Sequence, residues 1–181
     1  GRSYSLIYSR ISCRLLCRYA VSSRIHPSAS PFIIDVTAAI EKLFPLFAEN
    51  DYVIHLGDGN RDMAQAYAAF PGKTFVCRGN CDFSAPYARD EWEIEVEGVK
   101  IFACHGHAYG VKTDLAGLRA EAVRRGARAA LFGHTHIACD EEAGGVLLFN
   151  PGCAGLYTSA PSYGYLVVNG DKITATVVPL L

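Results

Sequence analysis

Short apolar segments that end in polar, glycine-containing loops recur along the chain. Four of them combine β-branched, aromatic and small apolar residues over stretches too short for a typical helix. They cover Tyr52–Leu56, Thr74–Cys77, Val99–Cys104 and Ala129–Phe132. We therefore predict four buried strands, each followed by a loop that carries polar side chains.

Between these strands, apolar residues recur at helical spacing. A first helix is predicted from Asp35 or Thr37, either of which can cap its N-terminus, and Pro45 should kink it or end it near its last turn. Further helices are predicted over residues 63–70 and 114–125. The first half of the chain thus alternates strand and helix.

The C-terminal half is richer in strands. Additional β-prone runs cover residues 93–96, 146–149, 163–168 and 173–178, and the hairpin-like turn Asn169-Gly170-Asp171 separates the last two. Strand and helix alternate first, and strands dominate later. This pattern favours an α/β fold in which helices cover two packed sheets.

The composition is that of a globular protein with one core. The chain has 181 residues, of which 50% are hydrophobic and 19% are charged, and this suits a single domain over residues 1–181. With 17 Lys and Arg against 18 Asp and Glu, no global positive field favours a long nucleic acid as partner. A phosphorylated ligand would have to be held locally, for example by metal.

The cysteines and the absence of long apolar runs bear on the compartment. The seven cysteines are odd in number, and most lie within apolar runs, which favours a reducing environment. No apolar stretch approaches the ~20 residues that span a bilayer, and the Arg-containing start lacks the continuous apolar segment of a signal peptide. We expect a cytoplasmic protein that does not bind a membrane.

Metal-ligating residue types stand where the four predicted strands end. The loops begin with Gly57-Asp58, Gly79-Asn80, His105 and Gly133-His134-Thr135-His136. Taken singly, Asp58 and Asn80 could be turn residues and His105 a buried, hydrogen-bonded imidazole, whereas two histidines two residues apart fit a loop around an ion. Because open α/β folds assemble sites at the carboxyl ends of strands, the four loops together predict a metal site with nitrogen and oxygen ligands.

In this order, the motifs G-D, G-N-x-D, H-G-H and G-H-T-H resemble the calcineurin-like metallophosphoesterase family, in particular its small bacterial and archaeal phosphodiesterase branch. The matching residues are Gly57-Asp58, Gly79-Asn80-Cys81-Asp82, His105-Gly106-His107, Gly133-His134-Thr135-His136 and the trailing Asn150-Pro151-Gly152. The resemblance covers the chain from about Ile40 onward. It implies a four-layer αββα sandwich, in which helices flank two mixed β-sheets, and a centre of two divalent metal ions.

Carried over to this chain, the family pattern makes Asp58 the ligand that bridges both ions. Asn80, His105 and His134 would hold one ion, and His136 would hold the other. Manganese is the expected metal, with nickel, iron, cobalt or zinc as alternatives.

The N-terminal D-x-H-G motif of the family, which should complete the second ion's ligands, is missing as such. Within the atypical segment 1–35, the nearest counterpart is Ser23-Arg24-Ile25-His26-Pro27, which offers His26 as a ligand but places Arg24 where the Asp should stand. Arginine stays protonated and has no acceptor, so it is no ligand. Asp35 could supply a carboxylate, although it suits a helix cap better. Either this metal position has decayed, or the segment is not the original reading frame of the gene.

The resemblance implies hydrolysis of a phosphate ester by a hydroxide that bridges the two ions, with Asp58, Asn80, His105 and His107 in the catalytic set. The general acid is open, because Cys81 stands where many relatives carry a His; His107 and a metal-bound water are the candidates. Cys81 itself is interpreted as a packed spectator.

Two further side chains near the motifs have expected roles. We expect Arg78 to form an ion pair with Asp82, and contact with phosphate is the alternative for Arg78.

These observations predict a phosphodiesterase that acts on a small phosphodiester, as a monomer or a homodimer. The alternative is a protein-binding scaffold, because a retromer subunit with a similar fold has a degraded metal centre. Arg24 permits that alternative, whereas the intact Asp58 and His134 favour the enzyme.

Overall fold

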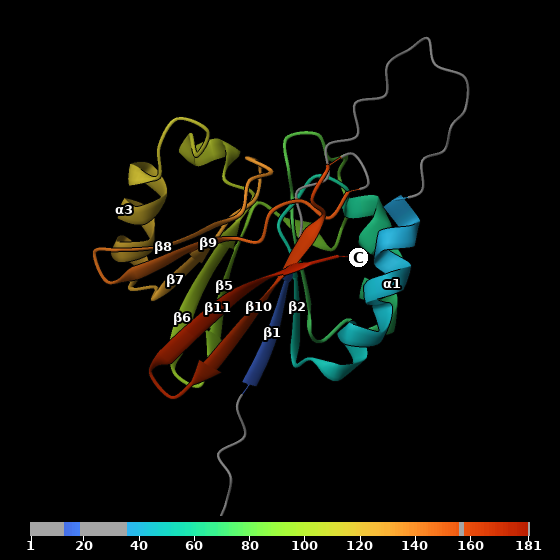
Figure 1. The fold of residues 1–181 in the computed structure, drawn as a ribbon, viewed down its shortest axis with the longest axis horizontal. Helices are drawn as coiled ribbons and strands as arrows, with labels where there is room; N and C mark the ends of the chain where they lie inside the picture. The colour runs from blue at the N-terminus through green and yellow to red at the C-terminus, as the bar shows by residue number, and fades with distance from the viewer. Residues whose placement is uncertain (1–12, 19–35, 156–157, 181) are drawn as a thin grey trace, which may run out of the picture.

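The computed structural model describes residues 13–18, 36–155 and 158–180, which form two β-sheets between helical layers (Figure 1). The six-stranded sheet has the order β11-β10-β1-β2-β3-β4, and the five-stranded sheet has the order β5-β6-β7-β9-β8. The strands of the first are β1 (Cys13–Arg18), β2 (Tyr52–His55), β3 (Thr74–Cys77), β4 (Ala88–Arg89), β10 (Ser162–Asn169) and β11 (Lys172–Pro179). Those of the second are β5 (Glu91–Val96), β6 (Val99–Cys104), β7 (Ala129–Leu131), β8 (Cys139–Ala143) and β9 (Val146–Asn150).

Both sheets are mixed. In the first, β1, β2, β3 and β4 are parallel neighbours, and β10 and β11 add antiparallel pairs. In the second, β6, β7 and β9 are parallel, and β5 and β8 pair antiparallel at the two edges. The helical elements are α1 (Val36–Glu49), η1 (Asn60–Met63), α2 (Ala64–Ala69), η2 (His107–Tyr109) and α3 (Ala116–Arg125).

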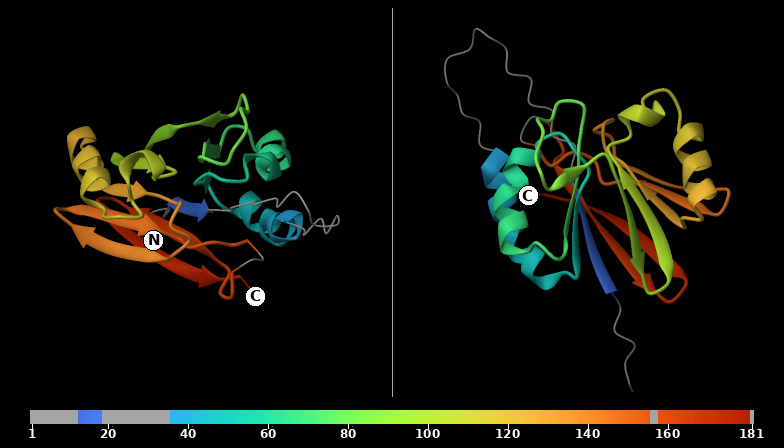
Figure 2. Two further views of the ribbon diagram at one scale, coloured as in Figure 1. Left: turned by 90° about the horizontal axis from the view of Figure 1, so that it is seen from above. Right: turned by 180° about the vertical axis from the view of Figure 1, so that it is seen from behind.

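Alternation along the strands explains why the molecule has four layers. In β10, Leu166 packs between the sheets while its neighbour Tyr165 packs on the α1 side. In β6, Ile101 faces the space between the sheets and Phe102 faces α3. Because successive side chains of a strand point to opposite faces, each sheet with two apolar faces needs a cover on both. Figures 1 and 2 show α1 and α3 on opposite outer sides of the two sheets. The predicted αββα sandwich is confirmed.

Most predicted elements are present, with differences that have physical reasons. Helix α1 does not end at Pro45 but continues for one turn, because Leu43 and Phe47 on either side of it are fully buried and their packing outweighs the lost backbone hydrogen bond. Thr37 lies inside α1, not at its cap, and Asp35 lies outside the described residues.

Three strands were not predicted. β1 lies within the segment set apart as atypical, yet it pairs with both β2 and β10 in the middle of the sheet. β4 has only two residues, and β8 is a charged edge strand without apolar alternation. Within the described residues, no helix combines the length and apolarity needed to cross a membrane.

Candidate metal centre

The predicted ligands come together because strands of both sheets end at the same place. Asp58 follows β2 and Asn80 follows β3, while His105 follows β6 and His134 follows β7. A hydrogen bond across the sheets joins the two halves: His105 Nδ1 lies 2.7 Å from the Leu56 carbonyl oxygen. The parallel pairing of β2 with β3 and of β6 with β7 therefore delivers four ligand-type side chains to one point.

His105 is at the centre of this cluster and is buried. Its Nε2 lies 3.4 Å from Asp58 Oδ2, 3.2 Å from Asn80 Oδ1 and 3.1 Å from His134 Nδ1. The carbonyl of Leu56 can only accept, so Nδ1 of His105 carries a proton and donates it there. In a neutral ring, Nε2 then presents a lone pair to the other ligands.

These contacts test whether the site fits a metal ion. The Asn80 amide nitrogen donates to Cys81 Sγ at 3.3 Å, which turns the amide oxygen toward His105. Carboxylate, amide and imidazole ligand atoms therefore converge on one point, an arrangement that a bound cation would stabilise. Asp58, His105 and His134 each offer a ligand atom within 4.8 Å of the others. The residues fit a divalent ion of the nitrogen- and oxygen-binding kind.

Asp58 is held tightly between the two loops of the first sheet. Its Oδ1 accepts a hydrogen bond of 2.9 Å from the Cys81 backbone N–H, and the side chain is almost fully buried. Gly79 lies directly against this carboxylate, and a Cβ there would overlap it. A Cβ on Gly57 would lie 2.6 Å from His105 Nδ1. Glycine is required at both positions because the ligands pack on the bare backbone.

Three of the predicted ligands have left-handed backbone conformations. The φ angles are 56° at Asp58, 65° at His134 and 61° at His136. Asp and His adopt this region more readily than most residues, but the conformation is strained and is kept where surrounding contacts enforce it. Strain concentrated on the ligand loops is consistent with a functional site.

Asp82 organises the loop that carries Asp58. Its carboxylate accepts backbone hydrogen bonds from Asp58 (2.9 Å), Gly59 (2.6 Å), Asn60 (2.9 Å) and Gly79 (2.8 Å). The predicted ion pair between Arg78 and Asp82 is wrong. Arg78 Nε instead lies 3.1 Å from Asp90 Oδ1, because the Asp82 oxygens are directed at the backbone.

Asn150, at the end of β9, organises the loop that carries His134 and His136, called the histidine loop below. Its amide nitrogen donates to the Gly133 carbonyl at 2.9 Å and to Thr135 Oγ1 at 3.0 Å, and its oxygen accepts from Gly152 N–H at 2.9 Å. The side chain is fully buried. The sequence resemblance includes Asn150, and the structure gives it this positioning contact.

The other predicted site residues lie at different distances from the cluster. His136 lines an open hollow of about 200 Å³, together with Asp58, Asn80, Cys81, Lys112, His134 and Thr135. His107 is exposed and lies beside the cluster, with its ring centroid 5.3 Å from that of His105. His26, Arg24 and Asp35 lie outside the described residues. The role of Lys112 at the hollow was not predicted, because nothing in its sequence context distinguishes it from a surface lysine.

Charge states at the site favour ligand binding. The pKa of His134 is lowered to about 4, chiefly by burial, and the neighbouring His105 and Lys112 contribute to this shift. Burial also lowers the pKa of His136. Both imidazoles are therefore neutral at pH 7, the form that binds metal. Burial alone would raise the pKa of Asp58, but the contact and charge interaction with His105 outweigh it, so the net pKa is lowered and the carboxylate is ionised.

Comparison with known proteins agrees with this geometry. Residues 18–172 match the calcineurin-like phosphoesterase superfamily domain. The chain belongs to this superfamily. The family resemblance found in the motifs is thereby confirmed, and the family is one of metal-dependent hydrolases. In this chain, Asp58, His105 and His134 form a possible metal-binding triad.

Relatives within the superfamily include bacterial proteins. A probable metallophosphoesterase of Bacillus subtilis, YsnB, is 34% identical over 134 residues, which cover 72% of this chain and 75% of the relative. The phosphodiesterase YfcE of Escherichia coli is 25% identical over 159 residues, which cover 75% of this chain and 83% of the relative.

Solved structures share the fold. A conserved protein of Streptococcus pneumoniae, described as a predicted phosphoesterase, superposes with a TM-score of 0.73 at 20% identity and covers 94% of this chain and 91% of its own. Vacuolar protein sorting 29 of Cryptosporidium parvum gives a TM-score of 0.68 at 19% identity, covering 94% and 92%. At these identities the likeness concerns the fold alone.

Proposed function

We propose that this superfamily member is a metal-dependent phosphodiesterase that hydrolyses a small phosphodiester. The observation that carries the proposal is the convergence of ligand-type oxygen and nitrogen atoms of Asp58, Asn80 and His134 around His105 Nε2. The name of the E. coli relative supports a diester as substrate. The hollow beside these groups is open, as a site for an external substrate requires.

The proposal includes two divalent ions, with manganese favoured over nickel, iron, cobalt or zinc. Asp58, Asn80, His105 and His134 would hold one ion, and Asp58 would share the second with His136. His26 remains a proposed further ligand of the second ion. When bound, the ions would clamp phosphate oxygens and lower the pKa of the attacking water.

The side chains around the hollow have their own tasks in this proposal. Cys81 N–H fixes Asp58 Oδ1, so that Oδ2 faces the cluster. Lys112 lines the hollow, where its ammonium group would offset charge on the phosphate. Although His107 is largely exposed, the partial desolvation of its ring lowers its pKa, with a further contribution from His105. A neutral His107 can orient a substrate oxygen or a water by hydrogen bonding, whereas the protonated form that a general acid needs is disfavoured at pH 7.

The test is hydrolysis of bis(4-nitrophenyl) phosphate and of 4-nitrophenyl phosphate by metal-stripped protein refilled with Mn²⁺. We expect metal-dependent turnover, with the diester preferred. His134→Ala and Asp58→Asn should each reduce turnover by more than about 100-fold, the upper range for residues that only support a metal ligand. Asp171→Asn, an exposed change in the β10–β11 turn, is the matched control and should have no effect.

The result also decides between the enzyme and the scaffold. Metal binding measured by calorimetry without turnover of either ester would contradict the phosphodiesterase. That result would support the alternative function, a protein-binding scaffold. Arg24 permits this alternative because it stands where the family has a metal-ligating Asp. Sedimentation of the same sample would distinguish the proposed monomer from the homodimer.

A further inference from the structure

A second cavity, of about 530 Å³, adjoins the hollow of the metal centre. Most of its lining side chains are apolar, and it shares Lys112 and Thr135 with the hollow. The lining residues are Val111, Lys112, Thr113, Asp114, Leu115, Phe132, Thr135, Ile137 and Cys139. Because Lys112 and Thr135 border both spaces, the hollow and the cavity adjoin at these two residues.

The cavity has a rigid floor and an exposed rim. Val111 and Phe132 are 5% and 1% exposed and belong to the core beneath α3, so the floor does not depend on a mobile side chain. Ile137, in contrast, is 71% exposed. A large apolar side chain at the rim of an apolar cavity is the arrangement that binds an apolar group and excludes water from it.

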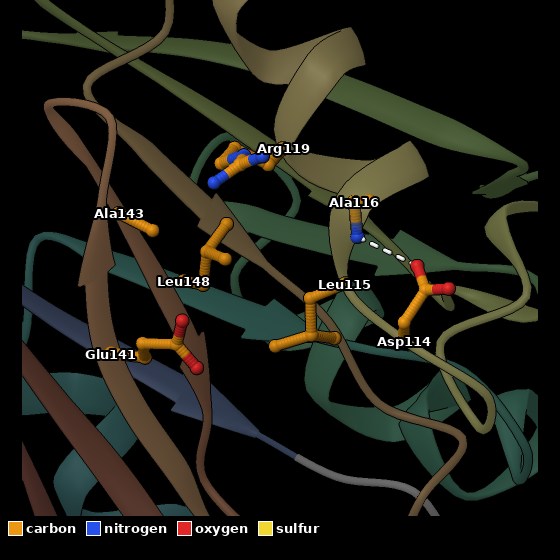
Figure 3. A pocket seen from close by; sticks show the side chains of 7 residues that line it. All are labelled: Asp114, Leu115, Ala116, Arg119, Glu141, Ala143 and Leu148. Carbon is orange, nitrogen blue, oxygen red and sulfur yellow. Dashed lines mark hydrogen bonds between the residues drawn. The ribbon is translucent and has the colours of Figure 1, made fainter.

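The charges at the cavity are placed for an anion at one end. Lys112 stands at the border with the hollow. The carboxylate of Asp114 is directed at the first residue of α3, where Oδ1 accepts a hydrogen bond of 2.9 Å from Ala116 N–H. Figure 3 shows this contact at the neighbouring pocket, which shares Asp114 and Leu115 with the cavity. The N-terminus of α3 offsets the negative charge of the Asp114 carboxylate, so this carboxylate repels an anionic ligand less.

We propose that the substrate is a phosphodiester with one apolar ester group of about the size of an aromatic ring. The phosphate lies in the hollow beside Lys112, and the apolar group lies in the cavity between Phe132 and Ile137. A volume of about 530 Å³ is sufficient for a ring with its substituents. This inference rests on the proposed function, for which it names the class of substrate.

The test compares two phosphonates that cannot be hydrolysed, so that binding is measured without turnover. Isothermal titration calorimetry of the full chain loaded with Mn²⁺ should show phenylphosphonate binding about tenfold tighter than methylphosphonate. Tenfold corresponds to about 1.4 kcal/mol, or burial of roughly 55 Å² of apolar surface. Ile137→Ser should remove most of this preference. Val123→Ser is the matched control, because Val123 is also an exposed apolar residue, at 54%, but lies outside the cavity.

Lys112→Met should weaken both phosphonates by a similar factor of roughly three to ten, because it removes the charge near the phosphonate while keeping the apolar stem. Equal affinities for the two phosphonates, a phenyl preference that survives in Ile137→Ser, or failure of both to bind would each overturn the inference. A retained phenyl preference in a protein that hydrolyses neither nitrophenyl ester would support this binding site and contradict the proposed function alone.

Discussion

Replacement of Asp82 by alanine should destabilise the protein far more than its half-buried position suggests. The carboxylate is the common acceptor for the backbone N–H groups of Asp58, Gly59, Asn60 and Gly79. It therefore holds the loop after β2 in its strained conformation and ties it to the loop after β3.

The magnitude follows from these four bonds. Hydrogen bonds to a charged group each contribute about 1.5–3 kcal/mol to stability. Water can replace part of the interaction at a half-buried site, so we count about 1 kcal/mol for each bond and expect Asp82→Ala to lower the free energy of unfolding by about 4 kcal/mol. Because the Asp58 amide is one of the donors, Mn²⁺ affinity should also fall by about 10–100-fold, as for other residues that orient a ligand.

Urea unfolding followed by circular dichroism, in excess chelator, measures the stability effect without a contribution from metal. Asp90→Ala is the matched control. Asp90 pairs with Arg78, but its side chain is 74% exposed, and such a surface pair contributes about 0–1 kcal/mol. If the two variants differ by less than about 1 kcal/mol, Asp82 does not organise the loop as argued. Unchanged Mn²⁺ affinity in Asp82→Ala would refute the link to the metal centre.

Three more predictions concern parts of the molecule around this loop. Arg125→Ala should lower the free energy of unfolding by about 2 kcal/mol, because the Arg125 guanidinium bonds the carboxylates of Glu91, Glu93 and Glu121 and stacks over Phe102. In urea unfolding, Arg125→Lys should lose less stability than Arg125→Ala but remain below the unmodified protein. Asn150→Ala should lower the free energy of unfolding by about 2–3 kcal/mol and weaken Mn²⁺ binding in calorimetry, whereas unchanged metal affinity would contradict its role in holding the histidine loop. Burial raises the pKa of Cys104 from 9.0 to about 12, so its thiolate is roughly a thousandfold rarer near pH 8 than that of an ordinary thiol; iodoacetamide should label exposed Cys81 but not Cys104, as peptide mass spectrometry would show.

The sequence by itself determined the elements whose hydrophobic pattern is local. β3 and β6 were predicted with the bounds they have, because each is a short apolar run between polar loops. The same runs placed Asp58, Asn80, His105 and His134 at strand ends, where parallel pairing had to bring them together. Family membership followed from the same loops, since their motifs are specific when they occur in one order.

Other features depended on partners far away in the chain. The position of β1 between β2 and β10 is set by hydrogen bonds to segments on either side, and its own six residues do not encode it. The exposed, charged β8 is a strand because it pairs with β9. In both cases tertiary pairing outweighs local propensity, which is weak for strands.

The roles of the supporting side chains were decided in the same way. Asp82 was expected to pair with its near neighbour Arg78, but four backbone donors from two loops occupy its oxygens, and Arg78 pairs with Asp90 instead. Lys112 and Ile137 are 25 residues apart and face one cavity only because the η2–α3 connection and the β7–β8 loop meet there. The sequence pattern identifies the side chains that can act as ligands, donors or acceptors. The packing of distant segments determines which of them contact one another.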